Sequence, residues 1–118
     1  EQGKVVTDRS RKGYLAVGVP GTVKGLDYAL NQYGTLSRQQ VIKPSIQLAE
    51  KGFILTEGDI RILKLNEKKF TEPNVAAIFL KDRKNSYQVG DYLIQKDLAQ
   101  TLKLLSDQGS DVFYNGII

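Results

Sequence analysis

The chain of 118 residues contains no cysteine, histidine, methionine or tryptophan, and the first two absences exclude whole classes of chemistry. Without cysteine the chain can form no disulfide bond and no thiolate nucleophile. Without histidine it can hold no Ser-His-Asp or Cys-His catalytic group. A zinc site would depend on carboxylates alone, which is not the ligand set that zinc prefers. We therefore expect no metal and no cofactor in this segment.

Long hydrophobic runs are also missing, since no stretch approaches the roughly 20 apolar residues that a membrane-spanning helix needs. Positive charge is in modest excess, with a formal net charge of +4 and an isoelectric point near 9.3. Such an excess raises the question of nucleic-acid binding. The basic residues are nevertheless scattered among acidic ones, with short clusters such as those at 64–69 and 81–84. Solvated surface is the favoured interpretation, and we expect no nucleic-acid partner and no membrane segment.

The missing methionine bears on the first residue as well. An intact translation product begins with methionine, whose removal normally needs a small second residue, and Glu1 is not small. No apolar remnant of a signal peptide follows it. We therefore expect the chain to be an internal piece of a longer protein, produced by design or by proteolysis.

The chain divides into a short polar part and a long helical part. Residues 1–13 lack periodicity and are expected to form a surface loop or arm, whereas residues 14–118 are expected to form one helical segment. The first helix is predicted from apolar residues spaced by three and four, which fall on one helical face. These residues are Val23, Leu26, Leu30 and Tyr33. Gly34 then stands where a helix commonly ends.

Polar residues predict where two further helices begin. Ser37 precedes Gln40 by three residues, which is the spacing of a capping box. Thr56 can cap the next helix, with Asp59 in its first turn, where a negative charge suits the helix dipole. Between them, Pro44 is expected to kink or restart the helix.

The last part of the chain combines an uncertain stretch with a strong helix. Two short apolar runs are compatible with a short β-hairpin around 77–89. A helix is predicted over 96–108, with Leu98, Leu102 and Leu105 on its buried face and Lys103 exposed. Gly109 is expected to end it, and residues 110–111 can cap one further turn that carries 112–114. The predicted fold class is therefore mainly α.

Four phrases of this sequence, in order and at these separations, resemble one protein family. They are Gly-Val-Pro-Gly-Thr-Val-Lys-Gly-Leu at 18–26, Tyr-Gly-Thr-Leu at 33–36 and Pro-Ser-Ile-Gln-Leu-Ala-Glu-Lys-Gly-Phe at 44–53. The fourth is Gly-Asp-Tyr-Leu-Ile-Gln-Lys-Asp-Leu-Ala-Gln-Thr-Leu at 90–102, followed by Val-Phe-Tyr-Asn-Gly at 112–116. Together they resemble the large subunit of γ-glutamyltransferase (γ-glutamyl transpeptidase), over nearly everything after Leu15.

This resemblance implies a multi-helix segment of the large subunit of an N-terminal-nucleophile hydrolase, a class with an αββα architecture. In that family one precursor cuts itself into a large and a small subunit. The new N-terminal threonine of the small subunit attacks the γ-glutamyl amide of glutathione and forms an acyl-enzyme. Water or an amino acid or peptide acceptor then takes the γ-glutamyl group. The implied partners are the rest of the large subunit and the small subunit, and a periplasmic or extracellular location is expected.

No catalytic or binding residue is carried over to this chain. The nucleophile and oxyanion hole of the family belong to the small subunit, and Thr7 and Thr22 are internal here. The large subunit contributes an arginine from an Arg-x-x-Ala-Pro context before the glycine-proline run. Arg9 and Arg11 stand near that place without the Ala-Pro, so they are interpreted as loop charges. We expect the segment to be inactive by itself.

Two alternatives stay open at the level of the sequence. Acylases related to cephalosporin acylase share the same phrases, and a stand-alone basic helical binding module is compatible with the composition. A piece cut from a larger enzyme should expose apolar faces that once met the rest of it, whereas a free-standing module should not. The sequence does not distinguish transfer from hydrolysis, nor does it identify the acceptor.

Overall fold

The computed structural model describes residues 3, 10 and 13–118, so Arg9, Arg11 and most of the expected arm lie outside the described residues. The predicted mainly helical fold is confirmed, with six α-helices in this part of the chain. They are α1 (Thr22–Tyr33), α2 (Arg38–Lys51), α3 (Glu57–Asn66), α4 (Pro73–Phe79), α5 (Lys96–Gln108) and α6 (Asp111–Tyr114). Two short strands, β1 (Phe53–Ile54) and β2 (Tyr92–Leu93), and the 3-10 turns Tyr14–Ala16 and Glu67–Lys69 complete the order.

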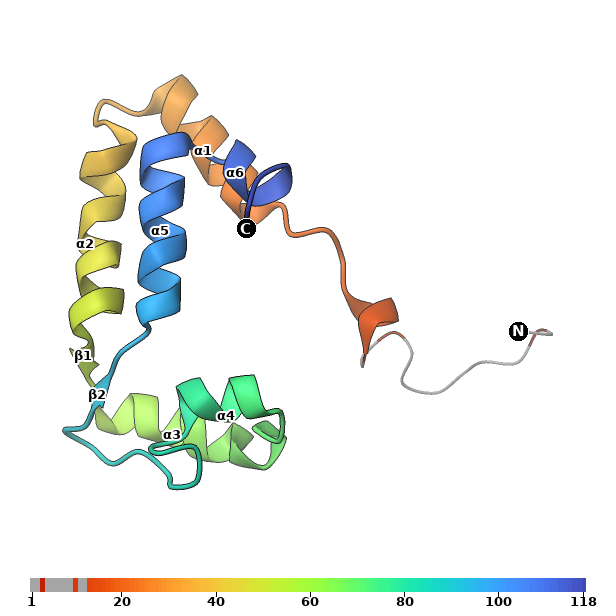
Figure 1. Cartoon of the computed structure of the whole chain (residues 1–118), viewed down its shortest axis with the longest axis vertical. Helices are drawn as coiled ribbons and strands as arrows, with labels where there is room; N and C mark the ends of the chain where they lie inside the picture. Colours follow the sequence, from red (N-terminus) through yellow and green to blue (C-terminus); the bar gives the residue numbers. More distant parts are fainter. Residues whose placement is uncertain (1–2, 4–9, 11–12) are drawn as a thin grey trace.

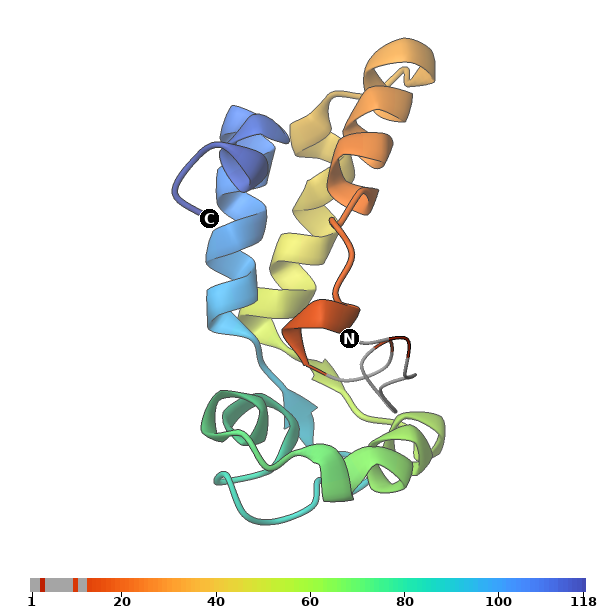
Figure 2. The ribbon, with the colours of Figure 1, turned by 90° about the vertical axis from the view of Figure 1, so that its right-hand side faces the viewer.

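The helices form two regions that are joined by the strands (Figures 1 and 2). In the upper region, α2 and α5 run antiparallel and side by side, with α1 and α6 at their upper end (Figure 1). In the lower region, α3 and α4 lie beneath the strands. Small residues are buried on the paired helices, Ala49 on α2 and both Ala99 and Ser106 on α5. Such small side chains let two helix backbones approach closely.

Both predicted caps are present. The Gln40 N–H donates to Ser37 Oγ at 3.3 Å, and the Ser37 N–H donates back to Gln40 Oε1 at 2.9 Å. Thr56 and Asp59 form the same reciprocal arrangement at the start of α3. Gly52 ends α2 with φ 81°, a left-handed conformation that favours glycine. These contacts join residues within four positions of one another, which explains why the sequence predicted them.

Pro44 was predicted to kink or restart the second helix, and the structure excludes the restart. Pro44 lies inside a continuous α2 that runs from Arg38 to Lys51. Proline removes one helical N–H, so the carbonyl four residues earlier loses its donor. Both Pro44 and Gln40 are exposed, and water can hydrate the carbonyl that is left.

The expected hairpin around 77–89 is also corrected. Helix α4 continues to Phe79, and only a single bridge, Lys81 with Asn85, closes the turn that follows. The two-stranded sheet pairs β1 with β2, antiparallel, with Phe53 opposite Leu93. An apolar run as short as 77–80 fits a strand or a helix, and Pro73 at the first turn of α4 favours the helix.

A buried apolar cluster lies in the lower region, where Leu55, Ile60 and Leu93 are in contact and Leu63 and Tyr87 pack against them. The predicted stripe on α5 is only partly right. Leu105 is buried, but Leu102 is half-buried and Leu98 is 41% exposed.

Lys103 is less exposed than predicted, since 38% of its side chain is accessible and its ammonium donates to Glu50 on α2. The buried residues of α5 are Ala99, Leu105 and Ser106, so the helix is rotated relative to the predicted leucine stripe.

Candidate functional site

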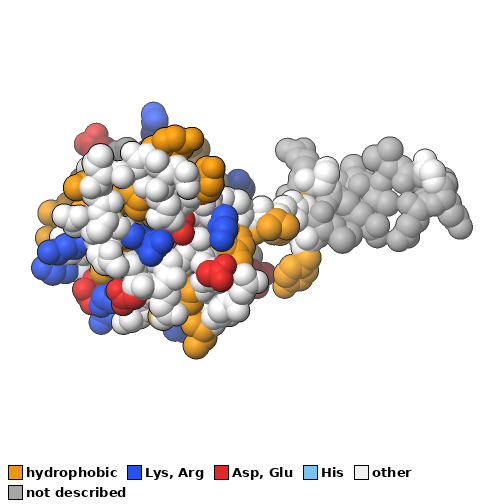
Figure 3. Space-filling model, turned by 90° about the horizontal axis from the view of Figure 1, so that it is seen from above, with side chains coloured by type: hydrophobic (Ala, Val, Ile, Leu, Met, Phe, Trp, Pro, Cys, Tyr) orange, Lys and Arg blue, Asp and Glu red, His pale blue; other side chains and the backbone are white. Residues whose placement is uncertain are grey.

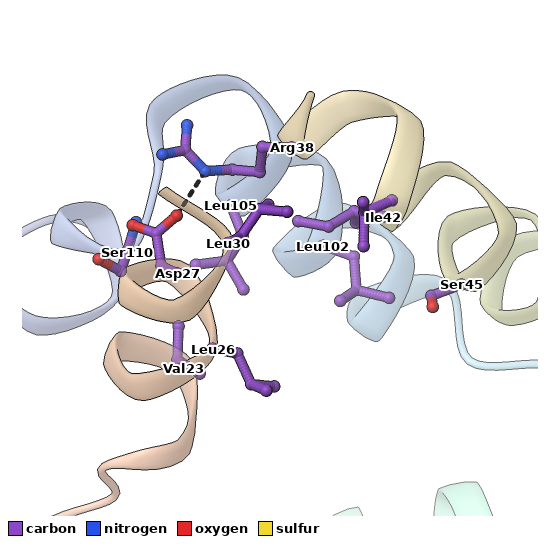
Figure 4. A pocket seen from close by; sticks show the side chains of 11 residues that line it. Val23, Leu26, Asp27, Leu30, Arg38, Ile42, Ser45, Leu102, Leu105 and Ser110 are labelled. Carbon is purple, nitrogen blue, oxygen red and sulfur yellow. Dashed lines mark hydrogen bonds and ion pairs between the residues drawn. The ribbon is translucent and has the colours of Figure 1, made fainter. Parts of the chain in front are cut away.

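An open cavity lies in the upper region, between α1, α2 and α5 (Figure 4). Its volume is about 480 Å³, within the usual range for small-molecule sites. Most of its lining is aliphatic: Val23, Leu26 and Leu30 from α1, Val41 and Ile42 from α2, and Leu102 and Leu105 from α5. The polar residues that line it are Asp27, Arg38, Ser45 and Ser110.

Asp27 is the centre of a polar cluster at the edge of this cavity (Figure 4). Arg38 Nε donates to its Oδ1 at 2.7 Å, and the backbone N–H of Ser110 donates to its Oδ2 at 3.2 Å. Burial alone raises the pKa of the Asp27 carboxyl, but the hydrogen bonds from Arg38 and Ser110 outweigh it. The pKa therefore lies below its ordinary value of 3.8, and Asp27 is a paired anion at neutral pH.

Gly109 makes room for this cluster. Its φ is 82°, and a Cβ at this position would lie 3.1 Å from the nearest guanidinium atom of Arg38. A side chain here would press on the guanidinium and strain the backbone. The sequence predicted Gly109 only as the end of a helix, whereas the structure assigns it a second role beside Arg38.

Tyr114 makes a second polar contact with α1. Its hydroxyl donates to the carbonyl of Pro20 at 2.6 Å and accepts from the backbone N–H of Lys24 at 3.1 Å. The N-cap of α1 is Gly21, which has no side chain to satisfy the free N–H groups of the first turn. The tyrosine hydroxyl supplies that acceptor from another helix. Lys24 also faces Asp111, at 3.7 Å between exposed side chains.

The paired carboxylate of Asp27 has little capacity for acid–base chemistry. The carboxylate of Asp27 is occupied by two donors and its lowered pKa makes it a weak base. Thr22 is the exposed first residue of α1, and Thr7 lies outside the described residues. In the described part of the chain, no three carboxylates lie close enough to hold a metal ion. The arrangement can accept apolar groups in the cavity, and its polar contacts join α1 to its neighbours.

Two pairs of these phrases meet in the structure. The phrase at 44–53 meets the phrase at 90–102 through the β1–β2 pairing and through the Gln95 N–H, which donates to the Ala49 carbonyl at 2.9 Å. The phrase at 18–26 meets 112–116 through Tyr114 and Pro20. The roles of Asp27, Arg38 and Tyr114 were not predicted, because their partners lie up to 94 residues away in the sequence.

Comparison with known proteins agrees with this arrangement of the phrases. A family model described as gamma-glutamyltranspeptidase matches residues 1–118. The chain belongs to the gamma-glutamyltranspeptidase family. It is 49% identical over 118 residues to the glutathione hydrolase proenzyme of Pseudomonas sp. (strain A14), a match that covers 98% of this chain and 20% of the relative.

Solved structures of the gamma-glutamyltranspeptidase family share the fold. The gamma-glutamyltranspeptidase of Helicobacter pylori superposes with a TM-score of 0.90 at 41% identity, over 98% of this chain and 34% of that one. The Acylase ACY 1 proenzyme of Pseudomonas sp. (strain SE83) is 38% identical over 120 residues, covering 98% of this chain and 21% of the relative. The chain thus spans about a fifth of the length of the curated relatives it matches.

No helix among the described residues combines the length and the apolar character that crossing a membrane would require.

Proposed function

We propose that this chain is a structural part of the large subunit of a glutathione-cleaving γ-glutamyltransferase. The parent enzyme would cleave the γ-glutamyl amide of glutathione and pass the γ-glutamyl group to water or to an amino acid or peptide. The observation that carries the proposal is the identity of 49% with a glutathione hydrolase proenzyme along the whole chain. Proenzymes hold both subunits in one precursor, which supports the rest of that precursor as the partner.

The surface of the molecule supports a role inside a larger assembly. Large apolar side chains are exposed on both regions, among them Leu65 at 76% and Leu26 at 67%. Seen from above, exposed hydrophobic side chains stand among basic and acidic ones on the upper region (Figure 3). The Cα radius of gyration is 17.7 Å, against about 13 Å for a compact domain of this length. A stand-alone binding module would bury more of these side chains in its own core.

Activity assays on the chain alone and on its parent test this function. The purified chain is expected to release no product from a γ-glutamyl anilide, because the described residues provide no nucleophile with a base beside it. The parent precursor, after it has cut itself, is expected to turn over the same substrate. Turnover by the purified chain that disappears with Thr7→Ala or Thr22→Ala would overturn the structural role.

The acylase alternative is supported by the identity of 38% with an acylase proenzyme. An assay with a matched anilide, whose acyl chain lacks the α-amino group, distinguishes an acylase from a glutathione-cleaving enzyme. A glutathione-cleaving parent should prefer the γ-glutamyl anilide, because a site built around the amino group leaves its own polar groups unpaired when that group is missing. A preference for the other anilide would favour the acylase.

A further inference from the structure

Helix α1 covers one side of the cavity without being packed into the core. None of its residues is buried, and Leu26, which lines the cavity, is still 67% exposed. Helices α2 and α5, by contrast, bury Ala49, Ala99 and Ser106. Apolar burial therefore contributes little to the position of α1 relative to its two neighbours.

Polar contacts hold α1 instead. The first joins Asp27 to Arg38 of α2 and to the Ser110 N–H, and the second joins Tyr114 of α6 to the Pro20 carbonyl and the Lys24 N–H. We call these four hydrogen bonds the α1 latch. They act at the first turn of α1 and near its middle.

The segment that leads into α1 leaves it free to move once these bonds are lost. Residues 17–21 are all exposed. A Cβ built on Gly18 or on Gly21 would meet no atom within 4 Å. The link from α1 to α2, residues 34–37, is exposed as well. Exposed connections with few contacts are the places where proteins open locally at low free energy.

We propose that α1 is a movable lid over the apolar cavity and that the α1 latch sets how often the lid opens. Breaking the latch releases α1 as a unit, while the α2–α5 pair keeps its position because its contacts do not depend on α1. This device belongs to the chain by itself, before the rest of the proposed precursor covers the exposed side of α1, and both of its tests measure structure, not activity.

Spin labels test the lid directly, because the chain has no cysteine that would compete for labelling. One pair of labels at Tyr28→Cys on α1 and Gln47→Cys on α2 reports the lid. A second pair at Gln47→Cys and Gln100→Cys reports the α2–α5 pair. All three positions are exposed. In the Asp27→Asn, Tyr114→Phe variant we expect the first distance distribution to broaden and the second to stay unchanged.

Hydrogen exchange gives the size of the effect. Amides of α1 are expected to exchange about fivefold faster for each lost hydrogen bond, while those of α2 and α5 keep their rates. The matched control is Tyr33→Phe with Asp107→Asn, which changes the same residue types at exposed positions. The control should behave like the parent chain.

Two results would contradict the proposal that α1 is a movable lid. One is an α1 exchange rate equal to that of the control. The other is a common increase in α1, α2 and α5, which would mean that α1 opens only with the whole upper region. If the double variant unfolds, the α1 exchange rate of the single variant Tyr114→Phe decides between these results. This substitution removes one hydroxyl from a half-buried side chain and leaves the charges in place.

Discussion

In the lower region Leu55, Ile60 and Leu93 form a buried apolar cluster, whereas in the upper region three helices line an open cavity of about 480 Å³. The corresponding hollow of the lower region, beside Phe70 and Phe79, measures only about 10 Å³. Apolar burial stabilises without regard to direction or pH. Hydrogen bonds to a carboxylate are directional and depend on its ionisation. The two regions should therefore respond differently to mutation and to acid.

The largest expected effect is in the lower region. Leu55 is 1% exposed, and Leu55→Ala should lower the free energy of unfolding by about 2–5 kcal/mol, because it removes buried methyl groups and leaves a cavity. Urea unfolding of the variant and the parent measures the difference. Leu65→Ala is the matched control on α3, where the side chain is 76% exposed, and it should cost less than about 0.5 kcal/mol. Equal losses from both variants would mean that this cluster is not the core.

A smaller effect is expected from Gly109→Ala in the upper region. The backbone at φ 82° and ψ −173° is a conformation essentially reserved for glycine, so the substitution should cost about 1–3 kcal/mol. It also presses on the Arg38 guanidinium that binds Asp27. Thermal unfolding measures the loss.

Gly25→Ala provides the opposite case within the same region. Gly25 lies inside α1 with no atom within 4 Å of an added Cβ, so alanine should stabilise the chain by about 0.5–1 kcal/mol. If both substitutions destabilised, the cost at Gly109 could not be assigned to its backbone conformation.

The smallest effect is the response of α1 to acid. The pKa of Asp27 lies below its value in the unfolded chain, so the stabilisation by this carboxylate is complete above about pH 4 and is lost as the pH falls through the folded pKa. The Tyr28–Gln47 label distance should therefore broaden as the pH is lowered from about 7 through the folded pKa of Asp27. Asp27→Asn should remove this pH dependence at α1. Acid broadening of the same size in that variant would assign it to other carboxyl groups.

Several local features could be predicted because their causes lie within one helical turn. The caps at Ser37 and Thr56, and the bounds of the helix over 96–108, depend on neighbours three or four residues away. The helix at 73–79 was missed because its apolar run is too short for its period to be recognised. The rotation of α5 was missed because leucines spread over a wide arc do not decide which of them faces α2.

The sequence by itself determined the mainly helical fold, the ends of most helices and the membership of the gamma-glutamyltranspeptidase family, since local hydrogen bonding and ordered phrases carry that information. Only the tertiary structure decided the pairing of Phe53 with Leu93, the cavity, and the contacts of Asp27 and Tyr114. Each of these joins elements whose relative placement depends on the packing of every helix between them. The residue pattern within one element does not predict how that element packs against the others.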